Sequence, residues 1–448
     1  MKNTNKPSKP LISFSYIFLT LVINVIIVGC GPKPIEYKIE ADVSSTFCSF
    51  KDSATSFERA SIFIEASSGM RGFTNPPNQS DDGFVLKTVL PKLATDLQST
   101  VAETRIVVQT MSREPISSSQ LFSRLTNRSL FRHGAYSNLG NYFPQIIKET
   151  RANELSFLIS DCIYDVVGAE NLAKQREVTD LIYSSLESKN WLAAMVFVFH
   201  SEFDGDWYYD MTTHNRPFNG REITLKNRPF YVWVFGSQQN LREFSEKNII
   251  ADYDHVFSYG MYPEDSPNFE LIKAYKTGKV AVLSDNRFVA HKPKSGDVFK
   301  FLLGVDLSKY STAMQDTSFL NQNLVLDKPY LREVIRFKSF KVDGYSSSLE
   351  RVGNRVKLAL DKELNPFTHV IEIEINSINE IPDQTFKISL TNREPAWIQN
   401  IYLRNDIGLS PEELEGKTPL FHLVSKAFSD KYLSEECSLF QIVLTKKN

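Results

Sequence analysis

The residues best placed to do chemistry in this chain follow a short apolar run near position 61. The segment 61–73 reads SIFIEASSGMRGF, and its β-branched first half predicts a strand buried on both faces of a sheet. Glu65, Ser67 and Ser68 come where that strand ends. In open α/β sheets, ligands bind in the crevice beyond the carboxyl ends of the strands. These acidic and hydroxyl side chains are therefore the first candidates for a binding site.

Polar residues at two later positions extend this pattern, which resembles the von Willebrand factor A (vWA) family. The family motif reads Asp-x-Ser-x-Ser before Met, and here Glu65, Ser67 and Gly69 occupy its three defining positions. Ser137 precedes an apolar helical pattern, where the family has a threonine, and Asp161 ends the next buried strand, where the family has an aspartate. In the family these oxygens hold a divalent cation, whose open position a carboxylate of the bound protein completes.

The resemblance implies that Glu65, Ser67, Ser137 and Asp161 are ligands of Mg²⁺ or Ca²⁺. Mg²⁺ requires nearly octahedral geometry at about 2.1 Å, whereas Ca²⁺ is more tolerant. The longer Glu65 side chain and the hydroxyl lost at Gly69 therefore favour Ca²⁺ or no metal. The alternative is a metal-free site, in which the serines cap backbone groups and Asp161 caps the following turn.

A second polar cluster follows the strand predicted at Trp191–Phe199. If the sheet is parallel, this cluster emerges as a loop on the same edge as Glu65, and we expect it to form a rim that contacts a protein partner. An acidic turn and a solvated arginine are the simpler interpretations. The predicted partner-contacting rim consists of Arg71, His200, Glu202, Asp204 and Asp206.

The N-terminus has the pattern of an export signal. Three lysines precede an apolar run over 11–28, which predicts a signal peptide at 1–29. The run ends in Gly29-Cys30 and resembles the lipobox of bacterial lipoproteins, which implies a lipid (palmitate) on Cys30. We therefore expect a lipid-anchored protein of the cell envelope, in the outer membrane if the organism is Gram-negative, because residue 31 is not aspartate. The alternative is a transmembrane anchor.

Composition narrows the function classes. The 51 basic and 53 acidic residues nearly balance and no basic block stands out, so nucleic acid is a poor candidate for a partner. The aromatic content of 12% indicates a well-filled globular core. Besides Cys30, three widely spaced cysteines remain, which allows one disulfide at most and gives no zinc pattern.

The alternation of strand and helix patterns predicts an α/β fold at 58–262, with a doubly wound, mostly parallel, vWA-like or Rossmann-like sheet. A tether at 30–57 precedes it, and a linker at 263–294 follows it. Short strands with turn punctuation predict a β-rich, sandwich-like domain with one helix at 295–448. Its elements are predicted as strands at Val298–Leu307, Leu331–Val342, Arg355–Leu360, His369–Ile375 and Thr385–Leu390, and a helix at Thr418–Tyr432.

The function expected from this pattern is partner binding, in adhesion or complex assembly, without enzymatic activity. On that basis, replacing Asp161 or Ser67 by alanine weakens binding without unfolding the domain. One alternative is a metal-assisted hydrolase at the same sheet edge, although no Ser-x-x-Lys, Gly-x-Ser-x-Gly or His-Glu-x-x-His motif occurs. The other alternative is a metal-free scaffold lipoprotein.

Overall fold

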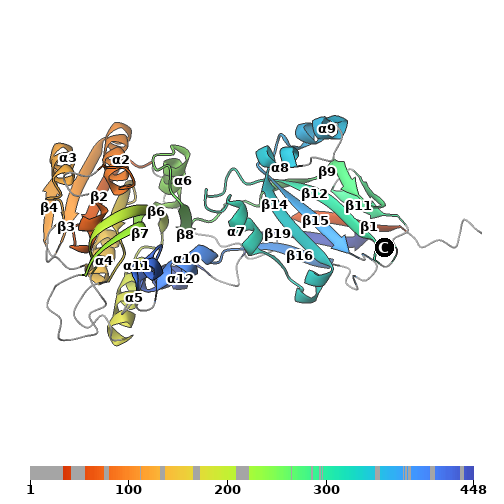
Figure 1. The fold of residues 1–448 in the computed structure, drawn as a ribbon. Helices are drawn as coiled ribbons and strands as arrows, with labels where there is room; N and C mark the ends of the chain where they lie inside the picture. Colours follow the sequence, from red (N-terminus) through yellow and green to blue (C-terminus); the bar gives the residue numbers. More distant parts are fainter. Residues whose placement is uncertain are drawn as a thin grey trace, which may run out of the picture.

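The chain folds into an α/β lobe and a β-rich lobe, drawn on the left and right of Figure 1. The predicted signal peptide, Cys30 and most of the predicted tether lie outside the described residues. No helix in the described part of the chain is long and apolar enough to cross a membrane. The computed structural model describes residues 34–41, 56–74, 80–110, 112–131, 137–164, 172–207, 221–263, 265–283, 286–291, 294, 296–348, 354–376, 378, 381, 385–403, 409–433 and 438–447.

The α/β lobe is built on a seven-stranded sheet with the order β4-β3-β2-β5-β7-β6-β8. Strands β3, β2 and β5 are parallel, whereas β4, β7, β6 and β8 each run antiparallel to a neighbour. The strands are β2 (Arg59–Glu65), β3 (Glu103–Gln109), β4 (Arg113–Ile116), β5 (Glu154–Ser160), β6 (Leu192–Trp207), β7 (Arg221–Ser237) and β8 (His255–Tyr259).

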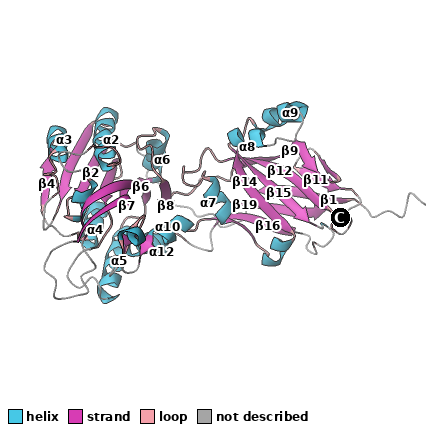
Figure 2. Cartoon of the chain, viewed as in Figure 1, coloured by secondary structure: helices cyan, strands magenta, loops and turns pink. Residues whose placement is uncertain are grey.

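The prediction of a mostly parallel sheet is therefore wrong, and the sheet is mixed. The cause is the long pairing of β6 with β7, the second of which inserts between β5 and β6. Two strands that follow one another in the chain and pair directly are antiparallel, because a parallel pair needs a long crossover. Helical segments cover both faces of this sheet (Figure 2).

One face of the sheet packs against α2 (Leu86–Thr100), α3 (Ser118–Thr126) and α6 (Gln238–Glu246). The opposite face packs against α4 (Leu139–Glu149) and α5 (Leu172–Glu187). The sequence between 117 and 130 shows no clear period, yet it contains α3. Ser117 begins that helix with a capping box to Gln120, which satisfies backbone groups at the helix start.

The β-rich lobe contains two antiparallel sheets, with the orders β10-β11-β1-β19-β16-β13 and β14-β15-β12-β9. Phe288 and Phe301, one from each sheet, lie 4.6 Å apart between ring centroids, so the two sheets share an apolar core in a sandwich-like arrangement. The strands are β1 (Ile35–Ala41), β9 (Asn268–Thr277), β10 (Val280–Val282), β11 (Arg287–Ala290), β12 (Val298–Asp306), β13 (Leu324–Leu326), β14 (Ile335–Lys341), β15 (His369–Asn376), β16 (Thr385–Thr391) and β19 (Ser438–Lys447).

Four of these strands fall where a tether or a linker was predicted. Strand β1 lies within 30–57 and pairs with β11 and β19, while β9, β10 and β11 lie within or across 263–294. The residues of β1 alternate, so Tyr37 and Ile39 are buried and charged neighbours are not. A seven-residue strand is too short for its alternation to stand out in a polar segment.

The strand predicted at Arg355–Leu360 is part of a helix, α9 (Asn354–Leu364). Its apolar residues occur at alternate positions, which suggested a strand. The helix instead buries Leu360 and Leu364, which lie four residues apart on one helical face, and leaves Leu358 71% exposed. Together with α8 (Val342–Ser348), α9 covers the outer face of the four-stranded sheet.

The C-terminal segment crosses back to the α/β lobe before the chain ends. Helix α12 (His422–Tyr432) packs against α5 and against the β7 face, where Phe421 stacks on Tyr231 at 4.5 Å. The chain then returns to the β-rich lobe as β19. Helix α12, which was predicted within the β-rich region, therefore packs with the α/β lobe (Figure 1). The other elements of this segment are α10 (Ala396–Ile401), β17 (Tyr402–Leu403), α11 (Pro411–Leu414) and β18 (Thr418–Pro419).

Candidate functional site

The carboxyl ends of β2 and β5 meet at one edge of the α/β sheet and bring the four predicted ligand residues together. Glu65, the last residue of β2, accepts a hydrogen bond from the hydroxyl of Ser160, the last residue of β5. All four candidate residues are buried: Glu65 is 0% exposed, Asp161 1%, Ser137 2% and Ser67 5%. The site predicted from the sequence is thus assembled, but it is closed to solvent.

The local electrostatics hold Glu65 in its protonated form near neutral pH. Burial raises the pKa of the Glu65 carboxyl to about 8, and the nearby charge of Asp161 contributes to this shift. The hydroxyls of Ser67, Ser137 and Ser160 act in the opposite direction. A protonated Glu65 adds no second negative charge beside Asp161.

This raised pKa predicts a pH dependence of stability that Glu65→Gln removes. The folded state binds the proton more tightly than the unfolded state, in which the pKa is near the ordinary value of 4.5. The stabilisation from this proton is complete below that value and is lost as the pH rises through about 8. Urea unfolding between pH 5 and 9 should therefore show a flatter profile for Glu65→Gln. If the unfolding free energy of wild type and of Glu65→Gln changed equally with pH, the stabilising proton would not be on Glu65.

Arg228 supplies the positive charge of this site. Its Nη2 atom donates to Oδ2 of Asp161 at 2.7 Å, and both side chains are 2% exposed. Burial raises the pKa of the Asp161 carboxyl, and the guanidinium counteracts that effect. The Oδ1 atom of Asp161 accepts from the backbone N–H of Ile163 at 3.2 Å, so Asp161 also caps the following turn.

Gly69 marks the centre of the site. A Cβ atom at this position would lie 3.0 Å from Oδ2 of Asp161 and 3.8 Å from both Nη2 of Arg228 and Oγ of Ser67. The position that matches the second serine of the vWA motif therefore faces the other candidate ligands. Gly69 lacks the hydroxyl that a serine would bring to this position, and the Arg228 guanidinium lies beside it.

Phe203 and Trp207 of β6, together with Arg228 of β7, cover the site, and we call them its roof. The Arg228 guanidinium lies over the rings of Phe203, Trp207 and Phe73, at 3.8, 4.4 and 5.1 Å from their centroids. A Cβ atom at Gly72 would lie 2.2 Å from the Phe203 ring, so only glycine fits beneath this roof. The Met-Arg-Gly-Phe part of the motif is explained by packing against these strands.

The residues as arranged do not fit Mg²⁺ or Ca²⁺. These ions need ionised carboxylates and room for further oxygen ligands. Glu65 is held protonated, Asp161 is bound by a guanidinium, and aromatic rings close the remaining side. Within the described ranges, no three His, Cys, Asp or Glu side chains are grouped closely enough to hold a metal ion.

The predicted rim does not form a loop, because His200, Glu202, Asp204 and Asp206 lie within β6. His200 faces the neighbouring β8 side, where its Nδ1 atom lies 3.0 Å from Oδ2 of Asp254. Asp204 and Arg71 lie near one another, since Nη2 of Arg128 donates to both of their carbonyl oxygens. His200 therefore lies apart from Asp204 and Arg71 within the predicted rim. The role of these residues in partner binding stays a prediction.

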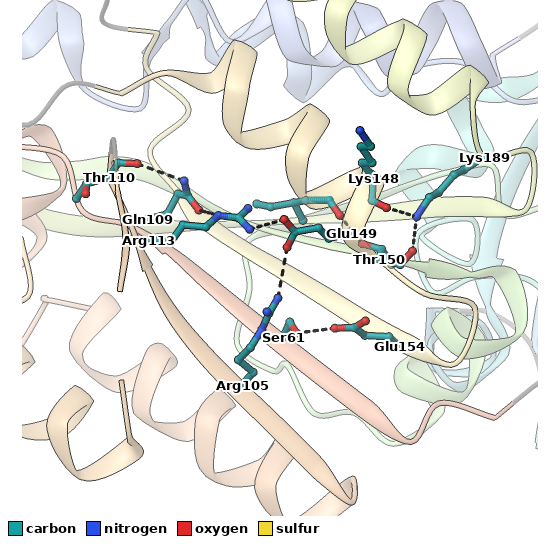
Figure 3. A network of polar contacts seen from close by, with 11 residues as sticks. Ser61, Arg105, Gln109, Thr110, Arg113, Lys148, Glu149, Thr150, Glu154 and Lys189 are labelled. Carbon is teal, nitrogen blue, oxygen red and sulfur yellow. Dashed lines mark hydrogen bonds and ion pairs between the residues drawn. The ribbon is translucent and has the colours of Figure 1, made fainter. Parts of the chain in front are cut away.

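A separate polar network lies toward the opposite end of β2 (Figure 3). The guanidiniums of Arg105 and Arg113 both pair with Glu149 at the end of α4, and both lie over the Phe63 ring. They border a cavity of about 480 Å³. Because the two arginines are held by the same carboxylate, this network ties α4 to β3 and β4.

Sequence analysis missed Arg228, the residue that sets the charge of the site. It occurs two residues before an apolar run at 230–235, where a flanking arginine is unremarkable. Only the insertion of β7 beside β5 brings it to Asp161. The only hint in the sequence was that Arg228, a charged residue, adjoins a long apolar run that predicts a buried strand.

Comparison of the chain with protein-family models, with curated proteins and with solved structures finds no match. The vWA resemblance therefore remains a prediction from the residues of this site.

Proposed function

We propose that this chain is a lipid-anchored protein of the cell envelope whose vWA-like α/β lobe binds a protein partner in adhesion or complex assembly. The parallel strands β3, β2 and β5, with helices on both faces, support the finer assignment of a doubly wound, vWA-like domain. The Gly29-Cys30 pattern supports the anchor.

One observation favours binding over catalysis: the acidic groups at the sheet edge are buried and internally neutralised. A hydrolase needs a carboxylate or a metal-bound water within reach of its substrate. Here Asp161 is 1% exposed and paired with Arg228, and Glu65 is fully buried. The β6 and β7 roof therefore separates these groups from any molecule in solution.

The test combines cross-linking in membranes with activity screening. Full-length protein, cross-linked in envelope fractions and purified with or without chelator, should yield the same partner in both conditions. Phosphatase, esterase and glycosidase substrates should show no turnover. Turnover that disappears in a folded Ser67→Ala variant would favour the hydrolase instead.

The anchor is tested in the same cells. Palmitate should label the wild-type protein and not Cys30→Ala, and the variant should leave the membrane fraction. Retention of an unlabelled, full-length chain in membranes would favour a transmembrane anchor over the lipid.

A further inference from the structure

The site at the ends of β2 and β5 contains a positively charged group of the chain itself, the guanidinium of Arg228. We infer that the Arg228 guanidinium takes the place of a divalent cation among Glu65, Ser67, Ser137 and Asp161. This inference concerns the chain's own side chains and holds whatever partner the protein binds.

The position of the guanidinium carries the inference. Its Nη2 atom is 2.7 Å from Oδ2 of Asp161. Nη2 and the Ser67 hydroxyl are equally distant, at 3.8 Å, from the point where a Gly69 side chain would begin. Asp161 and Ser67, two of the four predicted ligands, thus lie around the same position as one corner of the guanidinium.

The charges of the site agree with a single fixed positive charge. The carboxylate of Asp161 pairs with the Arg228 guanidinium at 2.7 Å, and both side chains are buried, so one negative and one positive group face each other there. A divalent ion at the same place would need both carboxylates ionised and would repel the guanidinium in a medium of low dielectric constant. One site therefore accommodates one of the two cations, not both.

The surroundings also suit a guanidinium better than a hydrated ion. Its flat faces meet aromatic rings, the closest being Phe203 at 3.8 Å and Trp207 at 4.4 Å. Such rings stabilise a poorly hydrated organic cation, whereas they offer the waters of a metal ion no oxygen or nitrogen acceptor. Both rings come from β6, so the roof and the internal cation belong to one paired unit of β6 and β7.

The experiment compares metal binding by full-length wild-type protein with that of Arg228→Met, which keeps an unbranched, flexible side chain but removes the guanidinium and its charge. Each protein is refolded with and without millimolar Mn²⁺, Mg²⁺ or Ca²⁺. Tm is then measured, and bound Mn²⁺ is counted by electron paramagnetic resonance. A second variant, Arg228→Met with Gly69→Ser, adds the hydroxyl of the family motif. Arg228→Lys serves as the control that keeps a positive charge.

We expect wild type and Arg228→Lys to bind no Mn²⁺ and to show no metal-dependent shift in Tm. Arg228→Met should be less stable, should recover about 5 °C in Tm with metal, and should bind one Mn²⁺, more tightly with Gly69→Ser.

Two results would overturn the inference. One is Mn²⁺ bound by the wild-type site and lost on Ser67→Ala. The other is an Arg228→Met protein, folded or unfolded, that binds no Mn²⁺ and whose Tm does not change with metal. The guanidinium would then have a role that a metal cation cannot replace.

Discussion

Asp161→Asn is expected to lower the free energy of unfolding of the α/β lobe by about 3 to 5 kcal/mol. The substitution keeps the shape of the side chain but removes the negative charge beside the Arg228 guanidinium. Both side chains are 2% exposed, so water cannot replace the lost carboxylate charge. Urea unfolding followed by circular dichroism measures the loss, and hydrogen exchange in β5 and β7 locates it.

A surface pair in the same lobe provides the matched control. Arg124 donates to Glu114 at 2.8 Å, but the Glu114 side chain is 40% exposed. Glu114→Gln should therefore cost no more than about 0.5 to 1 kcal/mol. Equal losses for the two variants would mean that burial of the Asp161 pair has no energetic consequence.

The burial of Asp161 limits what its mutation reveals about partner binding. The sequence alone suggested that Asp161→Ala weakens binding and leaves the fold intact. The structure places Asp161 inside the lobe, where a loss of binding would follow from unfolding. Exposed positions such as Arg71 are the informative ones for partner binding.

Phe428→Ala is expected to destabilise the α/β lobe by about 3 to 5 kcal/mol, although Phe428 comes from the C-terminal part of the chain. Its side chain is fully buried, and its ring lies 4.7 Å from Trp233 and 5.2 Å from Tyr259. Truncation leaves a cavity among large rings that cannot collapse. Urea unfolding followed by tryptophan fluorescence, to which Trp233 contributes, measures the loss.

Leu358→Ala is the control for removing a large apolar side chain. Leu358 is 71% exposed on α9, so its truncation should change stability by less than about 0.5 kcal/mol. Hydrogen exchange separates the two lobes. If Phe428→Ala increased exchange only in the β-rich lobe, α12 would not be part of the α/β core.

Local sequence patterns were sufficient for the elements whose partners lie close in the chain. Burial of β2 and β5 on both faces, and the helices α2, α4, α5 and α6, follow from apolar runs and helical spacing that neighbouring residues encode. The same local signals placed Glu65 and Asp161 at strand ends. Because β2 and β5 are parallel neighbours, the four candidate residues meet as expected.

The remaining features depend on contacts between distant segments, which local spacing does not encode. Strand β1 becomes a strand because β19 and β11 pair with it, and α12 covers β7 because the aromatic face there needs a partner. Arg228 reaches Asp161 across 67 residues, through the insertion of β7 beside β5. The sequence thus specifies which polar groups gather at the sheet edge. Long-range strand pairing and burial specify the cation among them, because they alone place a guanidinium beside the carboxylate and exclude water from both.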